Sequence, residues 1–249
     1  MANRTVRLSA GYNGPPDTAN GGYACGTFAK VAADHHRPPV AVALLVAPPL
    51  DRALEFRPGA RRSQIWDGDR LIATMTTAAA EFPTVDAVSL RTAVEASGRY
   101  RGHVSHPFPT CFVCGVNREP ADGFPVAPGE VPGALGTVAC PWTPTEASAE
   151  RPELVWSVLD CPGGWTSDPI REPMVLTRMV AVLHRPPRPL APHVVVARRR
   201  RRQGRTATVD TALHDDRGEL VAKATAMWTA VGIQEQADDR EPGDLDEDG

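Results

Sequence analysis

The most regular apolar pattern in the chain lies between residues 153 and 165, where apolar side chains recur every three to five positions. That spacing forms one stripe along a helix, so a buried helix is predicted over 152–161, closed by Pro162-Gly163-Gly164. The stripe consists of Leu154, Trp156 and Leu159. One carboxylate, Asp160, lies on its inner side. It is either a helix-end carboxylate that is exposed to solvent or caps the following Cys-Pro-Gly-Gly turn, or it is an active-site acid.

Short apolar runs bounded by turn residues predict β-strands in the rest of the chain. In the first half, a strand over 5–12 and a turn-rich loop precede a helix from about residue 23 to 33. An antiparallel meander follows, with strands at 40–46, 53–57, 61–66 and 70–79. In the second half, a strand at 134–140 precedes the helix over 152–161. Four more strands are expected at 174–183, 193–202, 205–214 and 219–231.

The two halves repeat each other in residues as well as in element order. Residues 44–51 (LLVAPPLD) correspond to residues 181–188 (AVLHRPPR). Residues 69–76 (DRLIATMT) correspond in the same way to residues 218–225 (GELVAKAT). Each half is therefore predicted to contain a strand, a helix and about four antiparallel strands, and the fold class is α+β.

This repeat divides the chain into an N-terminal unit, residues 1–81, and a C-terminal unit, residues 133–233. Between them, residues 82–132 are rich in proline and glycine, and they are predicted to be a mostly irregular connection with a helix near 87–97. The end of the chain, 234–249, contains eight acids and one arginine. Such a charged tail is expected to be disordered.

Composition places this chain among ordinary soluble proteins. With 249 residues, 42% of them hydrophobic, and a formal net charge of -3, it can bury a sizeable core. No run of about 18 apolar residues exists, so no membrane segment is expected. The N-terminus lacks the apolar stretch of a secretory signal, and a cytoplasmic location is predicted. The sequence has neither a Gly-rich phosphate loop nor a Gly-x-Ser-x-Gly motif, which argues against nucleotide binding and serine hydrolysis.

Four short motifs in this duplicated order resemble the acyl-CoA thioesterase II-like branch of the thioesterase superfamily. They are Asn20-Gly21-Gly22-Tyr23 at the first helix, Leu159-Asp160 in the second, His184-Arg185-Pro186 after the next strand, and Gly218-Glu219-Leu220-Val221-Ala222 in the last hairpin. The resemblance covers roughly residues 5–80 and 133–231. It implies a tandem (double) hotdog, in which two antiparallel sheets each wrap a central helix.

The resemblance also implies hydrolysis of an acyl thioester, carried by coenzyme A or an acyl carrier protein, without a metal or organic cofactor. Backbone N–H groups of Gly21 and Gly22 would bind the developing oxyanion, and Asp160 would act as base or nucleophile. A turn that needs positive φ explains the two glycines equally well. The expected substrate-binding residues beside these groups are Asn20, Tyr23 and Trp156. Hotdog units usually pair through sheet edges, so a homodimer is expected.

The chain departs from the family pattern at two positions of the catalytic network. The family threonine falls at Leu176, with Thr177 one residue away, and the family glutamine falls at Ala226. A one-residue slip reverses the face of a strand, so Thr177 can serve as the partner of Asp160 only if the strand contains a bulge. Two alternatives therefore stay open beside hydrolysis. The chain is either a non-catalytic acyl-binding or biosynthetic accessory protein, or a hotdog hydratase or dehydratase.

The cysteines offer a second candidate site. Three stand alone in apolar surroundings, as is typical of reduced thiols: Cys25, Cys140 and Cys161. Cys111 and Cys114 form a C-x-x-C pair, and His103 and His106 lie upstream, so the four could hold a structural zinc. The cramped spacing and the lack of a second C-x-x-C favour an ordinary loop with buried thiols, and a redox pair is the third alternative.

One basic run, residues 198–202 with Arg205, lies in a predicted strand. It lacks the interleaved aromatic residues of a nucleic-acid surface, so nucleic acid is not an expected partner. The run is either a solvated strand end or a binding site in which Arg200 and Arg202 contact the phosphates of coenzyme A or an acidic acyl carrier protein.

Overall fold

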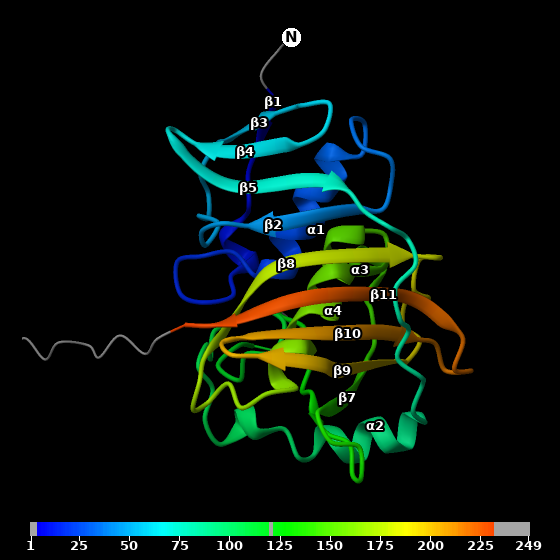
Figure 1. The fold of residues 1–249 in the computed structure, drawn as a ribbon. Coiled ribbons are helices and arrows are strands. Elements are labelled where there is room, and N and C mark those ends of the chain that lie inside the picture. Colours follow the sequence, from blue (N-terminus) through cyan, green and yellow to red (C-terminus); the bar gives the residue numbers. More distant parts are fainter. Residues whose placement is uncertain (1–3, 120–121, 232–249) are drawn as a thin grey trace, which may run out of the picture.

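The protein is a long antiparallel sheet with two central helices on one face (Figure 1). The computed structural model describes residues 4–119 and 122–231. The predicted tail at 234–249 lies outside these residues. The sheet contains 11 strands in the order β1-β3-β4-β5-β2-β8-β11-β10-β9-β7-β6. No helix in the described part of the chain combines the length and hydrophobicity needed to cross a membrane.

The elements follow the predicted order closely. The helices are α1 (Gly21–Ala32), α2 (Leu90–Ser97), α3 (Glu146–Ala149) and α4 (Pro152–Trp165), with 3-10 turns η1 (Ala10–Tyr12) and η2 (Arg101–His103). The strands are β1 (Arg4–Val6), β2 (Val40–Leu44), β3 (Leu54–Arg57), β4 (Ser63–Asp67), β5 (Arg70–Thr77), β6 (Gly129–Glu130), β7 (Thr137–Trp142), β8 (Met174–Leu183), β9 (His193–Gln203), β10 (Thr206–His214) and β11 (Leu220–Ala230). The first strand is shorter than predicted, because η1 replaces its second half. The sequence pattern missed α3 and β6.

The sequence repeat corresponds to a structural repeat about the centre of the sheet. The strands β2 and β8 pair there in antiparallel register, with Ala41 opposite Val180. Moving outward from this pair, β5, β4, β3 and β1 match β11, β10, β9 and β7 in order. The helices α1 and α4 are the matching helices, and they pack against each other. The repeat therefore brings the start of α1 and the middle of α4 together.

Two glycines in α1 allow this close helix contact. A Cβ atom on Gly22 would lie 2.5 Å from the Asp160 Cβ, and one on Gly26 would lie 2.7 Å from the Glu153 Cα. Neither distance is possible between non-bonded carbon atoms unless one of them moves. Gly21 and Gly22 do not have positive φ. The turn explanation for these glycines is therefore wrong, and the packing of α1 on α4 explains Gly22.

The helix α4 does not end at Pro162-Gly163-Gly164, and the prediction that these residues close it is wrong. It continues to Trp165 and keeps the proline inside. Proline removes one main-chain hydrogen bond, but the helix is held by packing on β11. Cβ atoms on Gly163 and Gly164 would lie 2.6 Å and 3.0 Å from the Trp228 indole, so only glycines let this ring pack against the helix.

The connection between the halves is more ordered than predicted. Figure 1 shows residues 82–89 passing along one end of the strands to α2, which packs against β7 and β9. Ser89 caps α2 by accepting a hydrogen bond from the Thr92 N–H at 3.0 Å. Its small residues Ala93 and Ala96 are fully buried.

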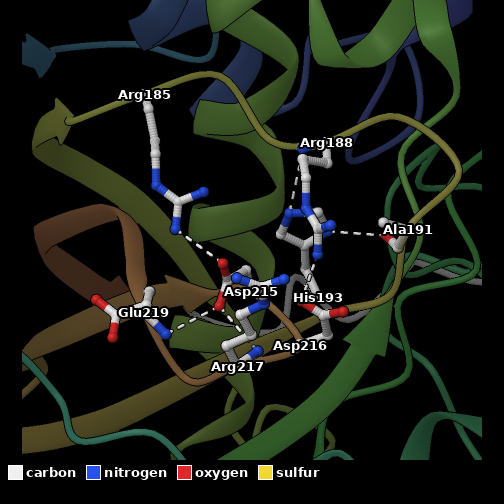
Figure 2. A network of polar contacts seen from close by, with 8 residues as sticks. All are labelled: Arg185, Arg188, Ala191, His193, Asp215, Asp216, Arg217 and Glu219. Atoms are coloured by element: carbon white, nitrogen blue, oxygen red, sulfur yellow. Dashed lines mark hydrogen bonds and ion pairs between the residues drawn. The ribbon is translucent and has the colours of Figure 1, made fainter.

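The buried carboxylate of Asp215 forms hydrogen bonds with both the turn after β8 and the turn after β10 (Figure 2). Asp215 accepts hydrogen bonds from the Arg217 and Glu219 N–H groups, both at 2.9 Å, which fixes the β10–β11 turn. Its other oxygen accepts from the Arg185 guanidinium at 2.9 Å. Two motifs that carry the family resemblance, around residues 184–186 and 218–222, are thus joined by one side chain.

Candidate functional site

A largely apolar cavity of about 350 Å³ opens where the N-terminus of α1 meets α4, β8 and β11. The polar groups on its wall come mainly from the two helices and the connecting segment. Asn20, Gly21 and Asp160 lie on one side, and three cysteines and His106 lie nearby. A cavity of this size and character is suited to an apolar ligand with one polar group.

The N-terminus of α1 presents backbone donors to this cavity. Asn20 caps the helix by accepting from the Tyr23 N–H at 3.0 Å. The Gly22 N–H donates to the Asp160 Oδ2 at 2.7 Å. In the part of the chain that the structure describes, no group accepts from the Gly21 N–H. The two amide groups therefore differ, because the Gly22 N–H binds the Asp160 carboxylate and the Gly21 N–H is available to a ligand.

Asp160 is buried, with 2% of its surface exposed, so the solvent-exposed interpretation of this acid is wrong. Its Oδ1 atom is also buried and has no hydrogen-bond partner among the described residues. Burial raises the pKa of Asp160 to about 8, although the Gly22 N–H lowers it and nearby Cys111 raises it further. A carboxyl group in this state can both take and give a proton near neutral pH.

The strands β8 and β11 supply the wall opposite Asp160. Thr177 does lie at a bulge, because Leu176 is opposite Trp228 while Arg178 is opposite Met227. The bulge does not turn its hydroxyl toward Asp160. The hydroxyl instead donates to the Met227 carbonyl at 3.1 Å.

Leu176 is the residue of β8 that faces the acid, since its side chain lies against Gly21. On β11, Ala226 is buried and supplies no polar group. Two residues further along the same strand, Trp228 lines the cavity, and its buried indole N–H has no partner among the described residues. The strands β8 and β11 therefore line the cavity largely with apolar side chains, and Thr177 and this N–H are the polar side-chain groups that they bring to it among the described residues.

Solved structures with the same arrangement of elements decide the fold. A tesB protein from Mycobacterium avium subspecies paratuberculosis matches with a TM-score of 0.59 and 12% identity, over 92% of this chain and 93% of that chain. The acyl-CoA thioesterase II TesB2 from Mycobacterium marinum matches with a TM-score of 0.55 and 14% identity, over 86% and 90%. The chain has the double hotdog fold. This confirms the predicted tandem α+β hotdog. No protein-family model and no curated protein matches the sequence.

Four of the five predicted substrate-binding residues of the hotdog lie away from the cavity wall. Tyr23 is buried and stacks on Tyr12, with ring centroids 4.4 Å apart. Trp156 packs against α1 at Gly26. Arg200 is bound to Asp210 and Arg202 to Glu172 on the exposed part of β9. Only Asn20 lines the cavity as expected.

The cysteines gather differently from the prediction. Cys161, which was expected to stand alone, has its Sγ 3.7 Å from the Cys111 Sγ. With Cys114, these form a cluster in which all three sulfur atoms lie within 4.8 Å of one another. Hydrogen bonds from the Cys114 and Cys161 thiols lower the pKa of Cys111, although burial opposes this shift.

The two histidines do not join this cluster. His103 is exposed, and its ring packs on Tyr100. Both ring nitrogens of His106 face the main chain. Nδ1 accepts from the Phe108 N–H at 2.9 Å, and Nε2 lies 3.1 Å from the Cys114 carbonyl oxygen. All five cysteines are free thiols, which confirms the prediction for Cys25, Cys140 and Cys161.

A second cavity of about 700 Å³ lies on the other side of Trp165, which lines both cavities. Its wall carries three arginines from separate elements: Arg99, Arg101 and Arg199. Asp168 partly neutralises them by pairing with Arg101 at 3.1 Å. No sequence pattern pointed to this group, because Arg199 is distant in the chain from Arg99 and Arg101, and only Arg199 belongs to the basic run.

Proposed function

We propose that this protein hydrolyses an acyl thioester in the cavity between α1, α4 and β8. One observation carries the proposal. Asp160 is buried in an apolar cavity, with one oxygen held by the Gly22 N–H and the other without a partner. A buried carboxylate with a free oxygen beside a helix N-terminus combines a proton acceptor with an electrophilic site for a carbonyl group. The double hotdog fold supports this proposal.

The reaction follows from these groups. The thioester carbonyl oxygen would accept from the Gly21 N–H at the start of α1, where the helix dipole also stabilises negative charge. Asp160, as carboxylate, would take a proton from a water molecule, and the oxygen of that water would attack the carbonyl carbon. The C–S bond then breaks, and the proton on Asp160 passes to the leaving thiolate. The products are a carboxylic acid and a free thiol.

The carrier of the acyl group is proposed to be coenzyme A. The second cavity, which is lined by arginines and lies next to Trp165, offers charged donors for the phosphates of coenzyme A. It adjoins the first cavity, which is proposed to hold the acyl group and is called the acyl cavity below. Arg200 and Arg202 line neither cavity. An acyl carrier protein is the alternative carrier, and a substrate panel that contains both acyl-CoAs and acylated carrier protein distinguishes them.

We also expect the protein to form a homodimer through a sheet edge, which size-exclusion chromatography with light scattering would test.

The decisive test is thiol release from a panel of short, long and aromatic acyl-CoAs. We expect turnover by the unmodified protein and a loss of about 100-fold or more in kcat/KM for Asp160→Asn, because general-base catalysis contributes about 10²–10⁴-fold. The matched control is Asp210→Asn, since Asp210 is also buried but lies on β10 beside Arg200. Equal rates for Asp160→Asn and the unmodified protein would contradict the proposal.

A second function is favoured by the apolar wall opposite Asp160. Leu176 and Ala226 stand where the resemblance implies a threonine and a glutamine, so the chain would bind acyl groups without hydrolysing them. Tight binding of acyl-CoAs together with no thiol release from any of them would support this accessory role and exclude hydrolysis.

A further inference from the structure

The three buried thiols at the wall of the acyl cavity are arranged as metal ligands. Cys111 and Cys114 come from the segment that connects the two halves, and Cys161 comes from α4. A tetrahedral zinc ion with Zn–S bonds of about 2.3 Å holds its sulfur ligands about 3.8 Å apart. The Cys111 and Cys161 sulfurs are 3.7 Å apart, and Cys114 lies within 4.8 Å of both. A movement of at most about 1 Å by Cys114 completes the geometry.

The turn that carries the first two thiols is built to point them the same way. The Gly115 N–H donates to the Cys111 carbonyl at 2.8 Å, which closes the turn around the C-x-x-C pair. A Cβ atom on Gly115 would lie 2.4 Å from that carbonyl oxygen, so only glycine fits directly after the second cysteine. The glycine of the C-x-x-C-G sequence is thus required by the backbone, and the turn presents the two sulfurs to one point.

A neighbouring amide group is placed to donate to two of these sulfur atoms. The Asn20 Nδ2 donates to the Cys161 Sγ at 3.4 Å and lies 3.9 Å from the Cys111 Sγ. Amide donors around a metal-bound sulfur stabilise its negative charge and orient it. Asn20 itself is held in place, because its Oδ1 caps α1. This donor is therefore preorganised.

We propose that Cys111, Cys114 and Cys161 bind one zinc-type divalent cation and leave its fourth coordination position open to the acyl cavity. All three cysteines line this cavity, and no fourth histidine, cysteine or carboxylate among the described residues belongs to the group. Both nitrogens of His106 already face the main chain. Three protein ligands with an open fourth position is the arrangement of catalytic rather than structural zinc.

Asp160 directly precedes Cys161 and lines the same cavity as the three thiols. Three thiolates and a dication sum to one negative charge, so the metal site would supply Asp160 with no net positive partner. The inference stands independently of hydrolysis, although it departs from the metal-free site implied by the family resemblance.

The test begins with the full chain, reduced and stripped of metal in the absence of air. We expect it to bind about one equivalent of zinc after gel filtration, measured by elemental analysis. Replacing zinc with cobalt should give thiolate-to-cobalt charge-transfer absorption together with the strong visible bands of a tetrahedral site. Less than about one tenth of an equivalent of either metal would overturn the proposal. A Cys111–Cys161 disulfide in protein isolated without air would also overturn it.

Three variants locate the site. Cys161→Ser should bind zinc at least about 100-fold more weakly, because loss even of an outer partner costs about 10- to 100-fold. Cys140→Ser is the matched control, since Cys140 is fully buried but lies on β7 outside the cluster, and it should bind as the unmodified protein does. His106→Ala should bind equally well. Full zinc binding by Cys161→Ser, or its loss in His106→Ala, would contradict this set of ligands. Thiol release is measured separately, so a failure of hydrolysis remains distinguishable from a failure of metal binding.

Discussion

At the scale of single residues, the site depends on which side chain faces Asp160 across the cavity. Leu176 holds that place, and its Cβ lies 2.8 Å from where a Cβ on Gly21 would be. The hydroxyl of the next residue, Thr177, bonds to β11. The acid therefore has an apolar neighbour on β8, and its Oδ1 has no donor.

This arrangement predicts a gain of activity on substitution of one residue. Leu176→Thr would place a hydroxyl beside Asp160, where it can donate to the free Oδ1 or to the attacking water. We expect kcat/KM for acyl-CoA to rise by about threefold to tenfold, which corresponds to roughly one hydrogen bond of about 1 kcal/mol. Leu183→Thr, at the far end of β8, is the control. The interpretation is wrong if both variants lose activity equally.

At the scale of the elements, the contact of α1 with α4 positions the site, and glycine makes it possible. Gly22→Ala would drive a Cβ atom to 2.5 Å from the Asp160 Cβ and 2.6 Å from the Trp156 carbonyl oxygen. We expect the free energy of unfolding to fall by about 1–3 kcal/mol, as for other overpacked cores. Urea unfolding measures this loss.

Gly98→Ala serves as the control for that substitution. A Cβ atom there would come no closer than 3.5 Å to the Glu95 carbonyl oxygen, and the residue has right-handed φ and ψ. Its stability should remain within about 0.5 kcal/mol of the unmodified protein. A similar loss in both variants would show that the contact between the helices tolerates a methyl group.

The turns joined by Asp215 give a pH-dependent prediction. Burial alone would raise the pKa of Asp215, but the Glu219 N–H, the Arg185 guanidinium and the Arg217 N–H lower it from 3.8 to about 2. Because the folded value is the lower one, the carboxylate stabilises the fold above about pH 4, and this contribution is lost as pH falls toward 2.

The corresponding variant is Asp215→Asn. Its free energy of unfolding should be up to about 2 kcal/mol lower than that of the unmodified protein at pH 7, and the difference should vanish near pH 2. Asp216→Asn is the control, since the Asp216 pair with Arg188 is exposed and should contribute less than about 1 kcal/mol. A difference for Asp215→Asn that stays constant from pH 7 to pH 2 would contradict this origin.

At the scale of the whole molecule, the two cavities that share Trp165 divide the proposed substrate into an acyl part and a phosphate-bearing part. Replacing both Arg99 and Arg101 with alanine should raise KM for acyl-CoA by about tenfold, because two charged contacts contribute about 1.4 kcal/mol or more together. The KM for an acyl-pantetheine without phosphates should not change.

Arg201→Ala is the control for this double variant. Arg201 is an exposed arginine of β9 that bonds to Gln203 and does not line the second cavity. Its KM for acyl-CoA should equal that of the unmodified protein. Equal effects of the double variant on both substrates would show that the second cavity does not bind the carrier.

Periodicity and the internal repeat were sufficient to predict most of the fold. The strands from β2 to β5 and from β7 to β11, and the helices α1, α2 and α4, follow from local patterns of side chains. The end of α4 could not be predicted in this way. Proline and two glycines normally end a helix, and only the packing of Trp228 on that segment explains why it continues.

By itself, the sequence determined a duplicated order of a strand, a helix and about four antiparallel strands, because a repeated pattern is a local property of the chain. Its short motifs, through the resemblance to a thioesterase family, implied the double hotdog and singled out Asn20, Gly21, Gly22 and Asp160. Only the tertiary structure decided the surroundings of Asp160. Contacts such as Cys161 with Cys111, or Arg199 with the second cavity, join residues that are far apart in the chain. Side-chain direction at a β-bulge likewise depends on the partner strand. The sequence alone therefore could not show which of Leu176 and Thr177 faces Asp160.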